Sequence, residues 1–168
     1  SGTGPYSVTT GWASAGSSAP LFVRRTTDTA YASTTPGNDN TLVLPLAANA
    51  TYTFEAFLSC SDSLQSSITG KIGFIDSSST MLKFGVNSAG GAPVGATVAT
   101  SSGNVAGIVS TLYLEDGVEG DQNFFYVKGI VTNGSSAGNL HLRCGISSSP
   151  SKYMRVFSNS YLTATRVQ

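Results

Sequence analysis

Residues 51–60 read TYTFEAFLSC, and residues 139–146 read NLHLRCGI. In both stretches apolar side chains alternate with polar or small ones, and this two-residue period is typical of a β-strand with one buried face. The apolar faces comprise Tyr52, Phe54, Ala56 and Leu58 with Cys60, and Leu140, Leu142 and Ile146 with Cys144. Since both cysteines share a face with apolar side chains, we expect buried free thiols, and a single disulfide is the other possibility.

Short apolar runs continue in both directions from these two strands. From Pro20 onward they alternate with clusters of Gly, Asn, Asp, Ser and Pro, the residues that tight turns require. Asn133-Gly134 opens one such cluster between two apolar runs, and it supplies the positive φ of a chain reversal, so we expect a hairpin over residues 124–146. The spacing predicts an all-β fold, a β-sandwich or jelly roll of about eight or nine strands.

The length and composition favour one domain. The chain has 168 residues, of which 40% are hydrophobic, enough for a single core. Its first nineteen residues are small and polar apart from Tyr6, Val8 and Trp12. We therefore expect an extended N-terminal arm over residues 1–19 and one β-sandwich domain over residues 20–168. Tyr6 and Trp12 are expected as anchors on the domain or on a neighbouring subunit, and a mobile tail is the other possibility.

The charge balance argues against two classes of partner. Only 11% of the residues are charged, and nine basic side chains are balanced by nine acidic ones. A nucleic-acid-binding domain or a peripheral membrane anchor usually carries a basic excess. No apolar run approaches the 18 residues that a membrane-spanning helix needs. We expect neither nucleic acid nor a membrane as partner.

The side chains that carry most enzyme chemistry are scarce. The single histidine, His141, falls at the centre of a strand beside Arg143, where an outward-facing structural role is expected. The loop LEDGVEGDQN holds four carboxylates, but their spacing does not match a calcium-binding loop, and a solvated turn is the favoured interpretation. These carboxylates are Glu115, Asp116, Glu119 and Asp121. We predict no catalytic, cofactor-binding or metal-binding residue and do not expect an enzyme.

Aromatic residues are the remaining candidates for contact with a partner. Tyr113 and Tyr153 fall near loops, and with Tyr6 and Trp12 they are the predicted interaction residues. The other candidates are spread over separate strands and loops, and most of them are expected in the core or in subunit contacts. They are Tyr31, Phe124, Tyr126 and Tyr161.

Two parts of the chain, about half of its length, resemble a known family. The first part comprises residues 23–29, 32–35, 38–42 and 46–55, and the second comprises residues 127–131, 138–144 and 160–167. Their order of threonine-rich strand, polar turn, apolar strand, Ala-Ala-Asn and aromatic strand resembles small β-rich virion proteins of tailed bacteriophages. The family pattern usually has Trp or Phe followed by Ala-Gln near 143–145, where this chain has Arg143-Cys144-Gly145. Independently of the family, residues 47–50 are expected to make a tight connection into the aromatic strand.

The resemblance implies a structural role in the virion, because members of the family serve as capsid decoration proteins or as tail-fibre domains. With the short chain and the N-terminal arm, it leads us to expect a capsid decoration (cement) protein. Such a protein would bind the major capsid protein on the outer capsid surface as a homotrimer. The alternative is a tail-fibre or receptor-binding domain that contacts host polysaccharide through Tyr113 and Tyr153. A carbohydrate-active enzyme is less favoured, since two well-placed carboxylates are hard to find.

Overall fold

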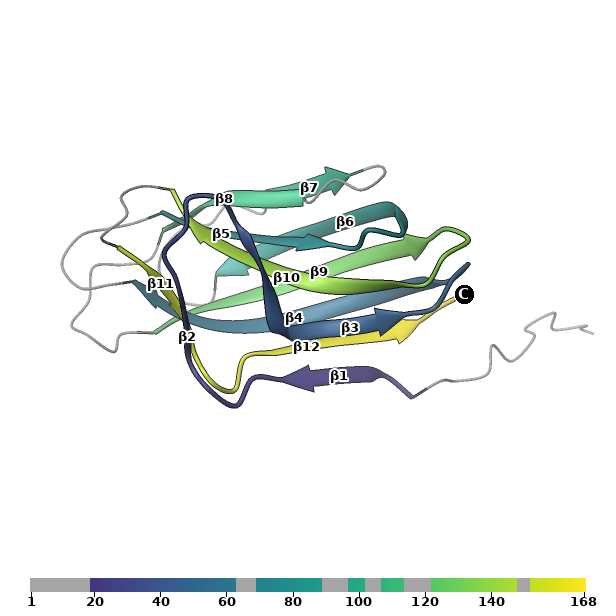
Figure 1. Cartoon of the computed structure of the whole chain (residues 1–168), viewed down its shortest axis with the longest axis horizontal. Helices are drawn as coiled ribbons and strands as arrows, with labels where there is room; N and C mark the ends of the chain where they lie inside the picture. The colour runs from purple at the N-terminus through teal and green to yellow at the C-terminus, as the bar shows by residue number, and fades with distance from the viewer. Residues whose placement is uncertain (1–18, 63–68, 89–96, 102–106, 114–121, 148–151) are drawn as a thin grey trace, which may run out of the picture.

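A computed structural model describes residues 19–62, 69–88, 97–101, 107–113, 122–147 and 152–168. Within these ranges the chain forms twelve β-strands and no helix, in two antiparallel sheets, so the predicted all-β sandwich is confirmed (Figure 1). The strands are β1 (Leu21–Arg24), β2 (Thr29–Tyr31), β3 (Gly37–Leu46), β4 (Thr51–Asp62), β5 (Thr69–Ile75), β6 (Ser79–Ser88), β7 (Thr97–Ser101), β8 (Gly107–Tyr113), β9 (Asn123–Asn133), β10 (Gly138–Ile146), β11 (Met154–Val156) and β12 (Tyr161–Arg166). The count exceeds the expected eight or nine because β2, β7 and β11 are short and lack a clear apolar run.

The order of the strands is that of a jelly roll. Sheet A runs β1-β12-β4-β9-β6-β7, with β11 and β2 joined to it through β4, and sheet B runs β3-β10-β5-β8. Strand β3 pairs with β10, β4 with β9, β5 with β8 and β6 with β7, which is the pairing of one long hairpin of chain. Additional pairing of β5 with β10 and of β6 with β9 shows that this hairpin is rolled up into two facing sheets.

The predicted hairpin over residues 124–146 is wrong, although both of its strands exist. Strand β9 lies in sheet A and β10 in sheet B, so the connection between them crosses the sandwich. It is held to the neighbouring β3–β4 crossing by hydrogen bonds from the Asn49 amide to the Gly134 carbonyl (2.7 Å) and from Asn133 Nδ2 to the Ala47 carbonyl (3.2 Å). Asn49 adopts a positive φ of 50°, as a tight connection at residues 47–50 requires. An alternating pattern cannot distinguish two strands that pair from two that face each other across a core.

The inner faces of the two sheets meet in an aromatic core. The Phe74 ring of sheet B lies 5.0 Å from the Phe54 ring and 5.1 Å from the Phe84 ring of sheet A, between ring centroids. Cys60 and Cys144 face this core from opposite sheets, fully buried and free, as predicted. Burial raises the pKa of the Cys60 thiol to about 12, and burial also raises that of Cys144. Both thiols therefore stay protonated in the folded protein at neutral pH.

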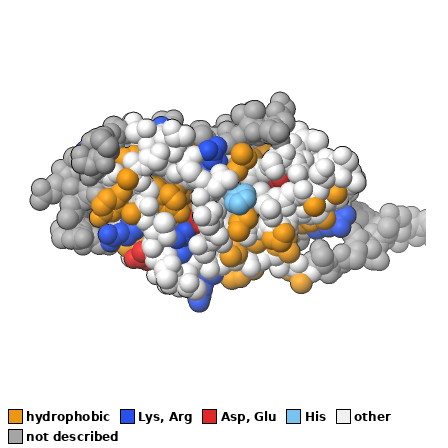
Figure 2. Space-filling model, in the orientation of Figure 1, with side chains coloured by type: hydrophobic (Ala, Val, Ile, Leu, Met, Phe, Trp, Pro, Cys, Tyr) orange, Lys and Arg blue, Asp and Glu red, His pale blue; other side chains and the backbone are white. Residues whose placement is uncertain are grey.

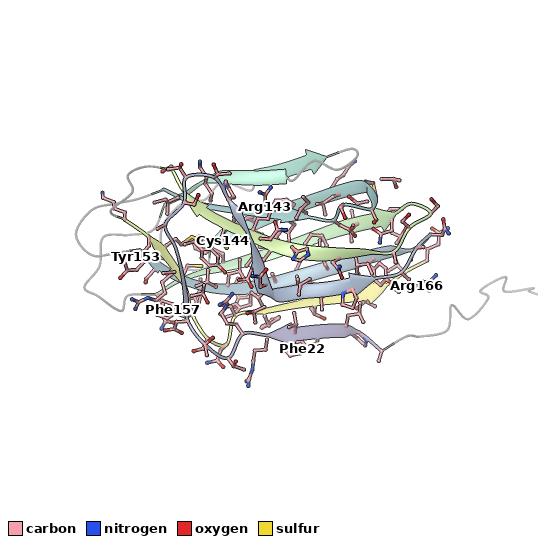
Figure 3. The ribbon with its side chains drawn as sticks, viewed as in Figure 1. Phe22, Arg143, Cys144, Tyr153, Phe157 and Arg166 are labelled. Carbon is pink, nitrogen blue, oxygen red and sulfur yellow. The ribbon has the colours of Figure 1, made fainter. Side chains whose placement is uncertain are left out.

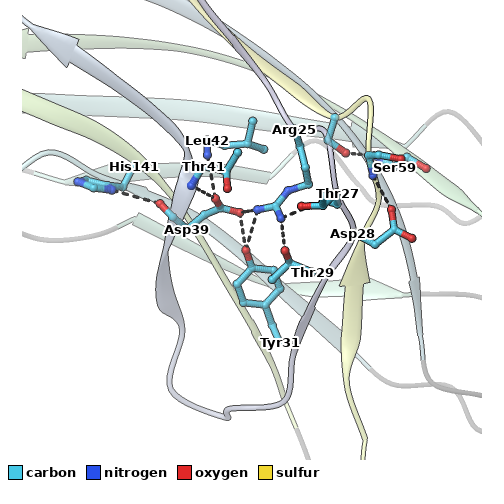
Figure 4. Close-up of polar contacts among 12 residues, drawn as sticks. Arg25, Thr27, Asp28, Thr29, Tyr31, Asp39, Thr41, Leu42, Ser59 and His141 are labelled. Atoms are coloured by element: carbon cyan, nitrogen blue, oxygen red, sulfur yellow. Dashed lines mark hydrogen bonds and ion pairs between the residues drawn. The ribbon is translucent and has the colours of Figure 1, made fainter.

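A buried ion pair joins the two sheets where β1 ends (Figure 4). Arg25, directly after β1 of sheet A, donates from Nη2 to Asp39 Oδ2 on β3 of sheet B, and the two side chains are at most 2% exposed. The same oxygen accepts from the Tyr31 hydroxyl, while Asp39 Oδ1 accepts from the amides of Thr41 (2.6 Å) and Leu42 (2.8 Å). Burial above all raises the pKa of the Tyr31 phenol well above its usual range, which keeps this donor protonated. The cluster joins the end of β1, the strand that pairs with β12 at one edge of sheet A, to β3 of sheet B.

The outer face of sheet B shows a mixed surface in Figure 2, where hydrophobic, polar and basic side chains are interspersed. His141 projects from β10 on this face, half-buried between Val43 of β3 and Ile75 of β5, with Nδ1 3.3 Å from the Asp39 carbonyl. The outward orientation predicted for this histidine is confirmed.

Candidate interaction face

Sheet A carries a row of aromatic side chains on its outer face. On β4 the side chains of Phe54, Ala56 and Leu58 point into the core, so Phe57 points away from it. In the register of the sheet, Phe57 lies opposite Tyr161 of β12 on one side and opposite Tyr126 of β9 on the other. Directly opposed side chains on neighbouring strands have Cβ atoms about 4.5–5.5 Å apart, so these three rings are brought side by side.

The rings contact one another across four strands. The Phe57 ring centroid lies 5.8 Å from that of Tyr161, 5.6 Å from that of Phe124 and 5.1 Å from that of Tyr126. Phe22 of β1 extends the series, with its ring 5.7 Å from that of Tyr161. We call these five residues the aromatic row. Ring pairs at such distances contribute about 0.5–1.5 kcal/mol each beyond the burial of their area, so the row is assembled before any partner binds.

The aromatic row is open to solvent in the single chain. Phe22 is 62% exposed, Tyr126 47% and Phe124 36%, whereas Phe57 and Tyr161 are half-buried among their neighbours. Core side chains of sheet A, such as Phe54 and Phe125, lie on the opposite face, so the row adds nothing to the core of the sandwich. Contiguous exposed apolar surface of this kind marks interaction sites more often than it occurs without a role.

Basic side chains surround the row. Arg24 lies opposite Tyr161 in the register, and Lys128 pairs with Glu55 at 3.1 Å (Nζ to Oε1) one step along β9 and β4. Lys83 is exposed on the same face of β6. Among the described residues of β1, β12, β4, β9 and β6, Glu55 is the one carboxylate on this face. The face is therefore aromatic at its centre and positively charged around it.

A second aromatic group lies on the short strand β11. The Arg155 guanidinium lies 5.4 Å from the Tyr153 ring centroid and 6.0 Å from that of Phe157, and its Nη2 donates to the Tyr153 hydroxyl (3.2 Å). In Figure 3, Tyr153 and Phe157 lie at the end of the molecule opposite Arg166. The Phe157 amide donates to the Ser59 carbonyl (2.9 Å), and Ser59 lies opposite Phe124. This group therefore borders the aromatic row across β4.

Of the four predicted interaction residues, the structure describes the side chain of Tyr153. Tyr153 belongs to the β11 group, next to a cation that the sequence did not pair with it. Tyr113 is the last residue of β8, and its side chain lies outside the described part of the molecule, as do Tyr6, Trp12 and the acidic loop. Of the other aromatics, which are expected mostly in the core or in subunit contacts, three lie outside the core and together on the outer face of sheet A. They are Phe124, Tyr126 and Tyr161, and their role in subunit contacts stays a prediction.

The row was missed because it depends on pairing between distant strands. Phe22 and Phe57 have no motif of their own. One local signal existed in residues 124–126, FFY, since a strand that buries the central Phe125 must turn Phe124 and Tyr126 outward. That pattern predicts two exposed rings. Their contact with Phe57 of β4, and through it with Tyr161 of β12, follows only from the sheet order.

The described part of the chain brings together no cluster of three or more His, Cys, Asp and Glu side chains. Within the same ranges there is no helix long and apolar enough to cross a membrane.

Comparison with known proteins adds little. No protein-family model and no curated protein sequence matches the chain. Among solved structures, it is similar to a chain in the structure of infectious bursal disease virus, Gx strain, at 10% sequence identity and a TM-score of 0.20. The match covers 89% of this chain and 40% of that chain. A similarity this distant carries no argument about function, which must come from the geometry of the molecule and from its sequence.

Proposed function

We propose that this chain is a structural protein of a bacteriophage virion, a capsid decoration (cement) protein that binds the outer capsid surface as a homotrimer and stabilises the shell. The single observation that carries the proposal is the aromatic row, a preassembled apolar surface left uncovered on a sandwich whose core is complete without it. A protein built to attach to other protein surfaces needs such a face, and it needs no catalytic group.

The composition of the row suits a protein contact. Aromatic side chains and Arg are enriched at the centres of protein interfaces, where burying one large ring contributes about 1.5–3 kcal/mol. The row offers Phe22, Phe124 and Tyr126 for such burial, with Arg24 at its border. The exposed threonines Thr53 and Thr165 share this face of sheet A and cost little to desolvate compared with charged side chains.

The resemblance to virion proteins supports the same role, and three of its matching segments fall on strands of sheet A or next to them. The matching segment 46–55 forms the β3–β4 crossing and the first half of β4, and segment 160–167 forms β12. Segment 127–131 lies in β9. These three strands carry four of the five residues of the row, but only Tyr161 lies within a matching segment, so the resemblance concerns the strands that present the row and not its side chains.

The test is the location of the unmodified full chain on particles. Purified protein is added to capsids of the encoding phage that were assembled without it, and the particles are examined by electron microscopy and by co-sedimentation. The proposal expects saturable binding at defined positions on the shell and greater resistance of the shell to heat. Binding to tails alone, or no binding to capsids, would overturn it.

A second candidate, a tail-fibre or receptor-binding domain, is favoured by one observation. The Tyr153–Arg155–Phe157 group combines rings with a guanidinium, and such a combination suits the apolar faces and hydroxyl groups of a sugar. The test is a glycan array probed with the full chain and with Tyr153→Ala. Specific binding to a host polysaccharide that this substitution abolishes would place the second candidate ahead of the first.

A further inference from the structure

We infer that the aromatic row is the surface on which a second copy of this chain docks, in a heterologous contact that closes a ring of copies. The inference rests on the proposed function, in which the protein acts as a homotrimer, and it names the surface and the partner that produce the assembly. Four properties of the face support it: the orientation of the rings, the area, the sign of the charges and the neutrality of the whole chain.

The ring geometry favours a protein partner over a sugar. A sugar ring stacks on the open face of an aromatic side chain. Phe57, at the centre of the row, is stacked against Phe124 on one side (17° between ring planes) and Tyr161 on the other (24°). These two neighbours flank the Phe57 ring within the chain, so at the centre of the row a partner meets mainly the edge of this ring. Ring edges and side-chain methyl groups of a second protein surface fit that arrangement.

The area of the face is sufficient for a specific interface. Strands β1, β12, β4, β9 and β6 are four to twelve residues long. With about 4.8 Å between strands and 3.3 Å per residue, their outer face measures roughly 700 Å². Specific protein interfaces bury about 600–1,000 Å² on each partner. A single copy seated on this face would thus cover it almost entirely.

The charges make another copy a suitable occupant. The face bears Arg24, Lys83 and Lys128 against Glu55. The chain carries nine acidic residues against nine basic ones, so a second copy brings carboxylates in a number that matches its cations. The formal net charge of zero means that copies do not repel one another as wholes.

The same charges argue against two rows packing on each other. A face-to-face dimer would place Arg24 and Lys83 of one copy against the basic side chains of the other, which costs free energy. A contact between the positive face and a different, more acidic surface is heterologous. Heterologous contacts that close generate rings, of which the homotrimer is one.

The experiment measures the mass of the assembly in solution. The full chain of 17.2 kDa is compared with the double variant Phe22→Ser/Tyr126→Ser, in which two exposed rings of the row are removed. The matched control is Val43→Ser/Ile75→Ser, which removes two half-buried apolar side chains from the outer face of sheet B. Light scattering after size exclusion gives the mass, and far-UV circular dichroism with thermal melting confirms that each variant is folded.

We expect the wild type and the control at about three times the monomer mass, and the row variant at the monomer mass. A monomeric wild type, or a folded row variant that keeps the wild-type mass, would overturn the inference. A row variant that keeps the wild-type mass but loses affinity for a polysaccharide would also overturn it, because the row would then be a polysaccharide-binding surface.

A further variant, Arg24→Glu, tests the heterologous arrangement. Reversing this charge should weaken association at least tenfold if the positive face meets an acidic surface. Stronger association would indicate that the aromatic rows of two copies pack on each other, and it would overturn the heterologous arrangement. Capsid binding is measured separately on the same samples. An assembled protein that depends on the row but does not bind capsids contradicts the proposed function and leaves this inference standing. A monomer that binds capsids overturns this inference and the homotrimer, and leaves the proposed capsid binding standing.

Discussion

Replacing Asp39 with Asn should destabilise the fold by an amount that can be worked out from the ion pair at the end of β1. The substitution keeps the shape of the side chain but removes the negative charge that compensates Arg25, whose side chain is 2% exposed. It also sets an amide group against up to four donors, namely Arg25 Nη2, the Tyr31 hydroxyl and the amides of Thr41 and Leu42. Removing one partner of a buried pair costs about 3–5 kcal/mol. That is a large part of the roughly 5–15 kcal/mol that stabilises a typical domain.

The assay is urea denaturation of the full chain, followed by circular dichroism. We expect the free energy of unfolding of Asp39→Asn to fall by about 3–5 kcal/mol with an unchanged dependence on urea. The double variant Arg25→Met/Asp39→Asn should recover much of this loss, because it leaves no uncompensated charge. A loss below about 1 kcal/mol for the single variant, the range of an exposed ion pair, would refute the conclusion that this pair locks β1 to β3.

Three further predictions concern other parts of the molecule. Gly129→Ala should lower the free energy of unfolding by about 1–3 kcal/mol in chemical denaturation. The reason is that an added Cβ would lie 2.3 Å from Phe54 Cζ and 2.6 Å from the Lys83 carbonyl oxygen. An unchanged free energy of unfolding would contradict this close packing of β9. Burial raises the pKa of Cys60 from 9.0 to about 12, so the folded protein keeps a proton that the unfolded chain releases. The contribution of this thiol to the free energy of unfolding should therefore be fully present below pH 9 and fall by up to about 1.4 kcal/mol per pH unit as the pH rises from 9 to 12. In the variant Cys60→Ala, the free energy of unfolding should decline less steeply over the same pH range. Deletion of residues 1–19 should abolish attachment to capsids while the assembly keeps its subunit number in light scattering, whereas full occupancy of capsids by the truncated chain would remove any role for the arm.

The sequence was sufficient for the features that depend on neighbours along the chain. The alternation in residues 51–60 and 139–146 placed both cysteines in the core, and residues 47–50 were identified as a tight connection. The Asn133-Gly134 turn is recognisable in the sequence, but the residues of a turn do not specify whether the chain reverses within one sheet or crosses to the other. The sheet order decides that, because β9 lies in sheet A and β10 in sheet B.

The features that depend on strand order could not be predicted from the sequence. Arg24 and Arg25 are adjacent and point to opposite faces, but the partner that compensates the buried Arg25, Asp39 of the other sheet, cannot be identified from any local pattern. The aromatic row likewise requires that β12, β4 and β9 be neighbours in the sheet, although they lie in distant parts of the chain. Residues that meet through such long-range contacts form both the Arg25–Asp39 ion pair and the aromatic row.

The most direct test of the central claim is a cryo-electron-microscopy reconstruction of particles carrying the full chain, at a resolution that shows side chains. We expect rings of copies on the outer capsid surface, with Phe22, Phe57 and Tyr126 of each copy covered by the next one. Copies that sit on the shell with the aromatic row facing solvent, or density for the protein at the tail alone, would contradict it.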